Sequence, residues 1–457
     1  MKKIVFLPIE TETRELDAKM ALASKLVNDD VDCIIGQHNL LNEIVHLFDG
    51  GIYIGKNIFL DAMKSTDEIR DSYKDNNFSI LWYHEEGAIY GGDEDKWRLV
   101  LEELLDPNRL FEDDVILCWG DFQKDFFSRS NPQADIHVVG GYRFDIKKNS
   151  LIRKLLQTNP RITEKDYVLI NTNFTAGNHY LKDAASYKAQ QEDSKNDLTN
   201  KHRLLVEFAD DTKRMGFFGE MISYLLVQNP NIQFVLRPHP TELIEFWGNL
   251  FHGYDNIKIT NEYSAVEWID RCSFVIQSGC TTALESYCLG KPIINYYPLK
   301  LANGIDLTEG LSTLCKTPEE VNQKINSSLP NNLEAEKGHH LKSLISNFKN
   351  DTSSIQMIAD IAKDSLKKKN KTKIQLSKIS FIIKKIKLIN ALKYYPRFLF
   401  KKKLKAYHMY VSHFPGFKYE QINSKVKTLN GSCEKSMDLN FISDELFILS
   451  SSKGKLD

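Results

Sequence analysis

Two short peptides in this chain contain residue types that transfer protons. His84-Glu85-Glu86-Gly87 follows the apolar run Phe78–Tyr83, and Arg237-Pro238-His239-Pro240 follows the apolar run Gln233–Leu236. Short apolar runs of this kind are typical of buried parallel strands. Both peptides are therefore expected at the carboxyl end of a parallel strand, where open α/β sheets bind their ligands.

The pair Glu85 and Glu86 is a candidate acid/base. A carboxylate beside an apolar strand end can have a raised pKa, which suits deprotonation of a sugar hydroxyl. Neighbouring side chains on an extended backbone point to opposite sides, so we expect one of the two to face a ligand. The alternative is a solvated pair without a role in chemistry.

His239 is a candidate proton donor or phosphate ligand. The prolines on both sides of it restrict the backbone, so the imidazole is expected to be held rigidly at the strand exit. Rigid placement suits a group that donates a proton or binds a phosphate. The alternative is a structural proline turn with a hydrogen-bonded histidine.

Small hydroxyl residues form a third candidate site. The peptide Ser278-Gly279-Cys280-Thr281-Thr282 follows the apolar run Phe274–Gln277 and opens a helix that we expect to end near Leu289. The N–H groups at a helix start, together with Ser and Thr hydroxyls, attract an anion such as a phosphate. The alternative is an ordinary helix N-cap.

Further polar residues follow predicted strands and are expected at the same edges. They are Glu10, Arg14, Arg143, Asp145 and Asn173. An arginine such as Arg143 can bind a carboxylate or a phosphate through two parallel hydrogen bonds. Asp145 is either a second catalytic carboxylate or the N-cap of a helix. The sequence contains no Walker loop, dinucleotide-binding glycine motif or metal-ligand cluster, so we expect no metal site.

The elements that must position these residues alternate along the chain. Helical patterns, as in Leu16–Val27, Trp97–Leu105 and Met215–Leu226, lie between apolar runs. The expected strands are Ile4–Ile9, Cys33–Gly36, Ile52–Ile54, Phe78–Tyr83, Val115–Trp119, Ile136–Val139, Tyr167–Asn171, Gln233–Leu236, Ile257–Ile259, Phe274–Gln277 and Ile293–Tyr296. This alternation predicts an α/β fold with parallel sheets that helices cover on both faces.

The length of 457 residues is too great for one ordinary core and predicts two α/β domains. We place them at residues 1–150 and 160–330, with the boundary in the polar segment 145–164. Residues 331–365 are expected to form helices that pack back on the body. Residues 366–457 are expected as a basic membrane-proximal extension and tail, in which 430–457 shows no clear pattern.

The bulk composition narrows the class of protein. It is 42% hydrophobic and 26% charged, as in globular proteins, and no apolar run reaches the roughly 18 residues of a membrane-spanning helix. The seven cysteines are odd in number and form no Cys-x-x-Cys pair. We therefore expect reduced thiols in a cytoplasmic protein and no zinc site.

The net charge of −1 hides a basic segment. Residues 367–405 contain fifteen Lys and Arg and no Asp or Glu, which leaves −16 for the rest of the chain. Apolar and aromatic residues, Phe381 and Tyr394 among them, alternate with the basic ones. Such a segment is typical of an anionic membrane surface. The alternative is a helix packed on the body with its lysines in water; nucleic acid is not expected, because the remaining surface repels phosphate.

Taken in order, the motifs resemble those of bacterial surface-carbohydrate-biosynthesis proteins. They are similar to GT-B transferases that use CMP-activated acidic sugars, such as polysialyltransferase-like enzymes and Kdo transferases. The likeness covers roughly residues 1–300. It rests on Pro8-Ile9-Glu10, Arg14-Glu15, Glu85-Glu86-Gly87, Trp119-Gly120, Arg143-Phe144-Asp145, Asn171-Thr172-Asn173-Phe174, Arg237-Pro238-His239-Pro240 and Gly279-Cys280-Thr281-Thr282. Gly141-Tyr142 departs from the Asn-Pro that commonly precedes Arg-Phe-Asp, and His84 stands where an acid is expected.

The resemblance implies a GT-B-like fold of two Rossmann-like domains whose parallel sheets face a central cleft, with a basic helical extension at the C-terminus. Glu86, or Glu85, would activate the acceptor hydroxyl, and His239 would contact the CMP phosphate and assist its departure. Asp145 would be the candidate nucleophile of a retaining reaction. The donor would be held by Arg237, Ser278, Gly279, Cys280, Thr281, Thr282, Asn173 and Arg143, and the acceptor side would contain Glu10 and Arg14.

The implied function is transfer of an acidic keto-sugar, Kdo or another nonulosonate, from a CMP-sugar to a lipopolysaccharide or capsule glycan. The CMP-sugar is a substrate, and neither a cofactor nor a metal is implied. The enzyme would be peripheral on the inner face of the bacterial inner membrane, reached through residues 367–405. The alternatives are a CDP-polyol-dependent glycerol or ribitol phosphotransferase of GT-B-like fold, a hexosyltransferase or epimerase that uses a UDP-sugar, and a non-catalytic membrane-docked assembly scaffold.

Overall fold

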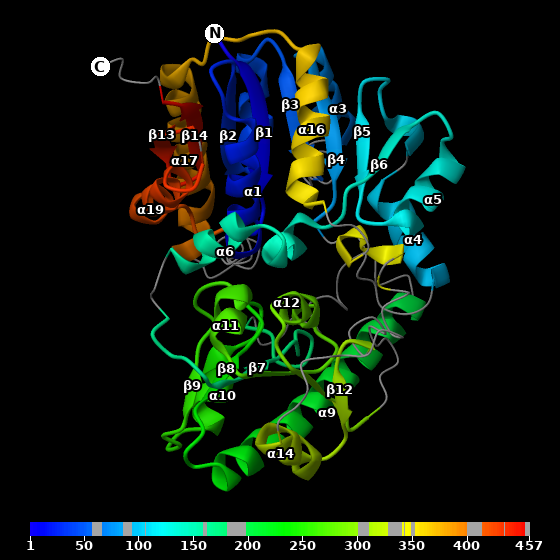
Figure 1. Ribbon diagram of the computed structural model, residues 1–457, viewed down its shortest axis with the longest axis vertical. Coiled ribbons are helices and arrows are strands. Elements are labelled where there is room, and N and C mark those ends of the chain that lie inside the picture. The colour runs from blue at the N-terminus through cyan, green and yellow to red at the C-terminus, as the bar shows by residue number, and fades with distance from the viewer. Residues whose placement is uncertain are drawn as a thin grey trace. The chain divides into compact units, whose positions relative to one another are not determined.

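The chain forms two compact units, each built on one sheet (Figure 1). The computed structural model describes residues 1–56, 66–85, 94–105, 107–158, 162–180, 198–299, 310–327, 341, 343–348, 352–399, 414–433 and 435–452. The first unit spans 1–88, 97–160 and 339–457, and the second spans 89–96 and 161–338. The predicted α/β class, with two Rossmann-like parallel-sheet domains and a basic C-terminal helix, is confirmed. The cleft between the sheets stays a prediction.

The first sheet contains eight strands among the described residues, in the order β13-β14-β2-β1-β3-β4-β5-β6. Its parallel strands are β1 (Lys3–Ile9), β2 (Val31–Gln37), β3 (Gly51–Gly55), β4 (Phe78–Tyr83), β5 (Val115–Cys118) and β6 (Asp135–Val138). Every residue of β1 after Lys3 and every residue of β4 is buried. Continuous apolar runs form such strands because helices cover both faces of a parallel sheet.

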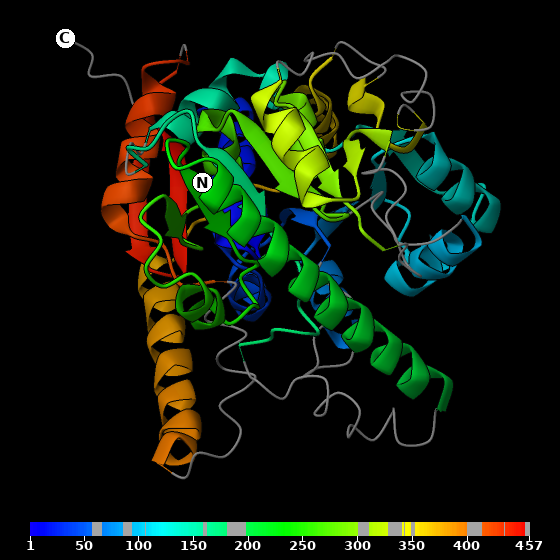
Figure 2. The same cartoon turned by 90° about the horizontal axis from the view of Figure 1, so that it is seen from below.

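A C-terminal hairpin completes the first sheet. Its strands are β13 (Met437–Ser443) and β14 (Leu446–Ser451), and β14 pairs antiparallel with β2. The sequence analysis placed residues 366–457 outside both domains, whereas this part of them extends the sheet. Part of the basic segment forms α17 (Leu376–Leu399), which packs on the first unit through α2 (His38–Ile44) and β13. Figure 2 shows α17 in orange, extending away from the red hairpin.

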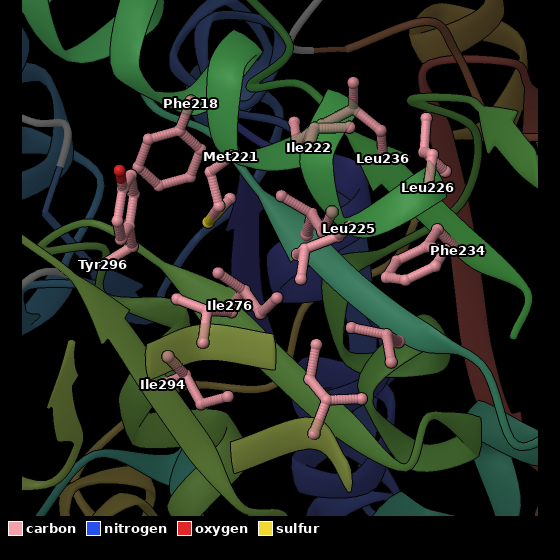
Figure 3. Close-up of a cluster of buried hydrophobic side chains, with 14 of the residues drawn as sticks. Phe218, Met221, Ile222, Leu225, Leu226, Phe234, Leu236, Ile276, Ile294 and Tyr296 are labelled. Carbon is pink, nitrogen blue, oxygen red and sulfur yellow. The ribbon is translucent and has the colours of Figure 1, made fainter. Parts of the chain in front are cut away.

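The second sheet contains six parallel strands among the described residues, in the order β12-β11-β10-β7-β8-β9. Their bounds are Val168–Asn171 (β7), Phe234–Arg237 (β8), Ile257–Ile259 (β9), Phe274–Gln277 (β10), Ile293–Tyr296 (β11) and Thr313–Cys315 (β12). One face of this sheet packs on α9 (Leu198–Gln228), whose residues Phe218, Met221, Ile222 and Leu225 point into the core (Figure 3). Their spacing of three and four residues places them on one side of the helix.

The remaining helices connect the strands. In the first unit they are α1 (Glu12–Leu26), α3 (Thr66–Asp75), α4 (Glu94–Leu104), α5 (Asp121–Ser130), α6 (Ser150–Gln157), α16 (Ser354–Lys367) and α19 (Tyr419–Asn430). In the second unit they are α10 (Ile244–Leu250), α11 (Ala265–Arg271), α12 (Thr282–Cys288) and α14 (Pro318–Asn326). None of the helices formed by the described residues combines the length and the apolar composition needed to cross a bilayer.

Candidate functional site

Each sheet has a topological switch point. This is a central strand from which the strand order continues in opposite directions on its two sides. In the first sheet β1 lies between β2 and β3, and in the second β7 lies between β8 and β10. Ligands of open α/β sheets bind beside the carboxyl ends of such strands. The predicted site residues divide between these two edges, and Glu86 lies outside the described residues. We consider the two edges one at a time.

At the first edge, Glu85 lies just beyond β4 and is buried in a network of charges. Lys19 of α1 forms an ion pair with it, with 2.9 Å between Nζ and Oε1. Lys19 Nζ also lies 3.3 Å from Glu15 Oε2 and donates to the carbonyl oxygen of Pro8. The hydroxyl of Tyr142 donates to the second oxygen of Glu85. Glu85 is therefore enclosed by protein groups rather than presented to solvent.

The electrostatics of this network distinguish its two carboxylates. Burial opposes ionisation of Glu85, but Lys19 and the Tyr142 hydroxyl outweigh it and hold its pKa below the ordinary value. Burial raises the pKa of Glu15, and Lys19 only partly offsets that effect. Burial alone would lower the pKa of Lys19, but the two carboxylates raise it. The network thus keeps Glu85 ionised beside a charged lysine, as an anchor between β1, β4 and α1.

Two tyrosines attach the loop after β6 to this anchor. The rings of Tyr83 and Tyr142 stack with their centres 4.8 Å apart. The Tyr83 hydroxyl donates to the carbonyl of Gly140 at 3.2 Å and accepts from the N–H of Tyr142 at 3.0 Å. Tyr142 occupies the position where the sequence analysis expected a proline. Its hydroxyl gives that departure a structural reason, because it holds Glu85.

Asp145 is fully buried and anchors another helix. Its carboxylate accepts hydrogen bonds from Asn347 Nδ2 at 2.7 Å, Ser353 Oγ at 2.6 Å and the N–H of Ile355 at 2.9 Å. Burial raises its pKa in spite of these bonds. Ser353 and Ile355 lie at the start of α16, so the carboxylate caps that helix. This geometry favours the helix-cap interpretation of Asp145, with the capped helix about 200 residues further along the chain.

The other predicted residues of the first unit lie around this network. Glu10 lies at the end of β1, with its Oε2 3.0 Å from the Nζ of Lys56. Arg14 is exposed on α1. Arg143 is buried, and its guanidinium lies 4.9 Å from the centre of the Phe144 ring. Glu10 and Lys56 flank the switch point, whereas Arg143 is held among aromatic rings.

At the second edge, four neighbouring strands each have a polar residue at their last position, or at the next-to-last position in β11. In spatial order they are Asn295, Gln277, Asn171 and Arg237, on β11, β10, β7 and β8. Asn295 pairs in register with Gln277, and Asn171 pairs with Arg237. The strand residues just before them point into the core that α9 covers, so these four point to the opposite face. We call them the polar row.

The polar row holds the loop that leads into α12. The amide oxygen of Asn295 accepts from the N–H of Gly279 at 3.2 Å, and that of Gln277 accepts from the N–H of Cys280. Asn171 Nδ2 donates to Thr282 Oγ1 at 3.2 Å. Gly279 has a φ of +64°, and no atom lies within 4 Å of the position where a Cβ would stand. Glycine fits this left-handed turn, and its open side admits a close ligand.

Two arginines flank the same loop. Arg214 of α9 donates to the carbonyl oxygen of Ser278 at 3.4 Å, to Ser278 Oγ at 3.3 Å and to Asn173 Oδ1 at 3.4 Å. Arg237 donates to the carbonyl of Tyr263 at 2.8 Å, and Tyr263 itself has a φ of +61°. Burial lowers the pKa of Arg237 to about 10. The positive φ of Tyr263 strains the backbone beside Arg237, and strain of this kind is typical of functional sites.

His239 and Glu242 form the third part of this edge. The Nδ1 of His239 accepts from the N–H of Thr241 at 3.3 Å, so a neutral ring carries its proton on Nε2. The buried carboxylate of Glu242 accepts from Thr172 Oγ1 at 2.7 Å, Trp247 Nε1 at 3.0 Å and the N–H of His239 at 3.2 Å. Burial raises the pKa of Glu242. Glu242 therefore joins the loop after β7 to the loop after β8, which contains His239.

The structure thus brings together the residues predicted for the second unit. Arg237, His239 and the peptide Ser278–Thr282 lie at or just beyond the ends of neighbouring strands, and Asn173 reaches the same loop through Arg214. The residues of the two edges that were missed include Lys19, Arg214, Glu242 and Asn295. Lys19 had a usable signal, because it stands four residues after Glu15 on an otherwise apolar helix face. The other three resemble ordinary surface polar residues in the sequence.

Comparisons with known proteins give only distant similarities. No family model matches the chain, and no curated protein matches its sequence. A UDP-GlcNAc 2-epimerase of Methanocaldococcus jannaschii, in complex with UDP-GlcNAc and UDP, is 14% identical over 79% of this chain and 100% of its own, with a TM-score of 0.45. A UDP-GlcNAc 2-epimerase from Neisseria meningitidis is 11% identical over 80% and 100%, with a TM-score of 0.42. The wall teichoic acid polymerase TagF is 13% identical over 80% and 89%, with a TM-score of 0.41. At these identities and scores, the similarities assign neither a family nor an activity.

Proposed function

We propose that this chain is a glycosyltransferase that binds a nucleotide-activated acidic sugar at the carboxyl edge of the second sheet. The observation that carries the proposal is the polar row together with Arg214. Among the described residues, four buried atoms of this set have no hydrogen-bond partner: Asn171 Oδ1, Asn295 Nδ2, Arg214 Nε and Arg237 Nε. A buried polar atom without a partner costs about 1–3 kcal/mol, so these atoms favour a ligand that bonds to them.

The chemistry of these groups supports an anionic donor. Guanidinium groups suit phosphates and carboxylates, and the open side of Gly279 admits a close approach to the backbone. A CMP-linked keto-sugar acid has both a phosphodiester and a carboxylate. We therefore propose CMP-Kdo or another CMP-nonulosonate as the donor, and a lipopolysaccharide or capsule glycan as the acceptor. Binding to the inner membrane through residues 367–405 is a separate proposal that rests on the surface of α17.

The proposed transfer exchanges one bond for another at the anomeric carbon. The acceptor hydroxyl attacks this carbon and gives its proton to Glu86, whose role rests on the sequence motif. The bond between the anomeric carbon and the phosphate oxygen breaks, and CMP leaves as a phosphate monoester anion. His239 would donate its Nε2–H to that phosphate, and the two arginines would stabilise the negative charge as it develops. Glu85, enclosed by Lys19 and Tyr142, would serve as the anchor of the neighbouring motif.

Calorimetric titration of the full chain with CMP, CDP and UMP tests the proposal. We expect CMP to bind in preference to UMP, and His239→Ala to weaken CMP binding about tenfold or more, because a hydrogen bond to a charged group contributes about 1.5–3 kcal/mol. His252→Ala is the matched control, since His252 is exposed in the turn that follows α10. Preference for UMP would contradict the CMP-sugar donor. Absence of nucleotide binding would favour the non-catalytic scaffold.

A donor panel then separates the two transferase reactions. Release of CMP from a CMP-nonulosonate in the presence of a glycan acceptor is the expected result. Release from CDP-glycerol instead would establish the polyol phosphotransferase. For either reaction, a cell that carries His239→Ala and Glu86→Ala should lose the surface glycan, whereas a scaffold would leave it normal.

A further inference from the structure

Helix α17 has two apolar faces, whereas a surface helix ordinarily has one. Its inner face contains Ile379 and Ile383, which are buried. This face packs on the first unit, where α17 contacts α2 and β13. The ion pair between Lys387 and Asp444 holds the helix to the turn of the β13–β14 hairpin. Packing of the inner face therefore accounts for the position of α17 on its unit.

The outer face of α17 is apolar and exposed. The side chains of Phe381, Leu388 and Leu392 are 68%, 61% and 67% exposed. At 100° per residue, their spacings of seven and four place them on one stripe, opposite Ile379. Lys384 and Lys385 lie on the two flanks of this stripe, and both are exposed. An apolar stripe between lysines is typical of a helix that lies in a membrane interface.

Charge identifies the occupant of this face. Residues 367–405 contain no acidic side chain, so two copies of the segment would repel each other. A bilayer with anionic lipids offers apolar chains for the stripe and negative head groups for the lysines. We propose that the outer face of α17 docks on an anionic membrane surface, with Phe381, Leu388 and Leu392 inserted among the acyl chains.

Vesicle flotation of the full chain tests the apolar half of this proposal. We expect the parent chain to bind vesicles of phosphatidylcholine and phosphatidylglycerol. Leu388→Glu combined with Leu392→Glu should weaken this binding tenfold or more. Burial of one leucine is worth about 1.5–3 kcal/mol, which is tenfold or more in binding. Leu205→Glu, at an exposed leucine of α9, is the matched control and should bind as the parent does. Equal binding of the double variant would overturn the proposal.

The lysines provide a second, independent measurement. Lys384→Ala combined with Lys385→Ala should weaken binding about fivefold per lysine at low salt, the equivalent of about 1 kcal/mol each near an anionic surface. The effect should disappear at high salt. Equal binding to phosphatidylcholine alone would contradict the role of charge. Light scattering that shows a dimer dispersed by Leu388→Glu, with no vesicle binding, would instead make the stripe a contact between two copies.

Discussion

The carboxyl edges of the two sheets use buried polar groups in opposite ways. At the first edge the charges are in contact with one another: Glu85 and Glu15 share Lys19, and Tyr142 occupies the second oxygen of Glu85. At the second edge Arg214 pairs with Asp211, but among the described residues one buried atom each of Arg214, Arg237, Asn171 and Asn295 has no hydrogen-bond partner. Groups that compensate one another hold a fold together, whereas buried groups without partners are suited to a ligand. The difference separates an anchor from a binding site.

Lys19→Met is the strongest test of the anchor. It leaves Glu15 and Glu85 buried without their cation, and removal of one partner of a buried ion pair costs about 3–5 kcal/mol. We expect the first unit to lose that much stability, as measured by hydrogen exchange of the β1 and β4 amides. Exchange of the β10 amides, in the second unit, should be unchanged. Lys25→Met, an exposed lysine of the same helix, is the control.

A second variant separates lost charge compensation from lost packing. Glu85→Gln in the Lys19→Met background removes one of the unpaired carboxylates and should recover part of the stability. If hydrogen exchange were the same in Lys19→Met and Lys25→Met, the network around Lys19 would not be an anchor. The proposed difference between the two edges would then not hold for the first edge.

Most parallel strands of both sheets were predictable because they are short apolar runs bounded by helices, but β12 was not predicted. The expected runs Phe78–Tyr83, Ile257–Ile259, Phe274–Gln277 and Ile293–Tyr296 coincide with β4, β9, β10 and β11. The hairpin β13–β14 was not predictable in this way. Its strands follow a long basic segment, and its partner β2 lies about 400 residues earlier. Long-range antiparallel pairing leaves no local pattern that identifies the partner strand.

The second edge was predicted more completely than the first. Arg237, His239 and the loop at Ser278 all follow apolar strands directly, so the topology alone brings them to one edge. The partners of Glu85 and Asp145 come from α1 and α16, and no local rule identifies them. Glu85 and Asp145 were therefore predicted as catalytic candidates, whereas their contacts in the structure are those of an ion-pair anchor and a helix cap.

Glu12→Gln tests whether the first edge contains a buried carboxylate that the nearby lysines do not fully compensate. Glu12 lies in the first turn of α1, near Lys425 and Lys418 of the α19 region and near Asp17. Burial raises its pKa to about 7 from the ordinary 4.5, so between these pH values the folded chain binds more protons than the unfolded chain. Stability must then fall as pH rises through that window. We expect the variant to gain about 2–3 kcal/mol on the parent from pH 4.5 to 7, as measured by urea unfolding.

The control for this pH effect is Glu420→Gln, because Glu420 is an exposed glutamate in the first turn of α19. Its stability relative to the parent should not change over the same window. A constant difference for Glu12→Gln would mean that folding does not change the pKa of Glu12. Lys418 and Lys425 would then offset the effect of burial on the pKa of Glu12.

Arg237→Met has the smallest expected effect on stability. The substitution removes one hydrogen bond to the carbonyl of Tyr263, and it also removes a buried Nε that has no partner among the described residues. These two changes oppose each other, so we expect unfolding free energies within about 1 kcal/mol of the parent. Binding of CMP should nevertheless fall about tenfold or more, because the lost guanidinium is the group that would bond the phosphate.

Arg271→Met provides the matched comparison for that last variant. Arg271, at the end of α11, also donates to a backbone carbonyl, that of Ile162, but it lies before β10 rather than beyond it. Its loss should lower stability through the missing bond and leave CMP binding unchanged. If Arg237→Met instead destabilised the second unit strongly and bound CMP normally, the polar row would be structural. Both edges would then be anchors, and the nucleotide site would have to be sought elsewhere in the chain.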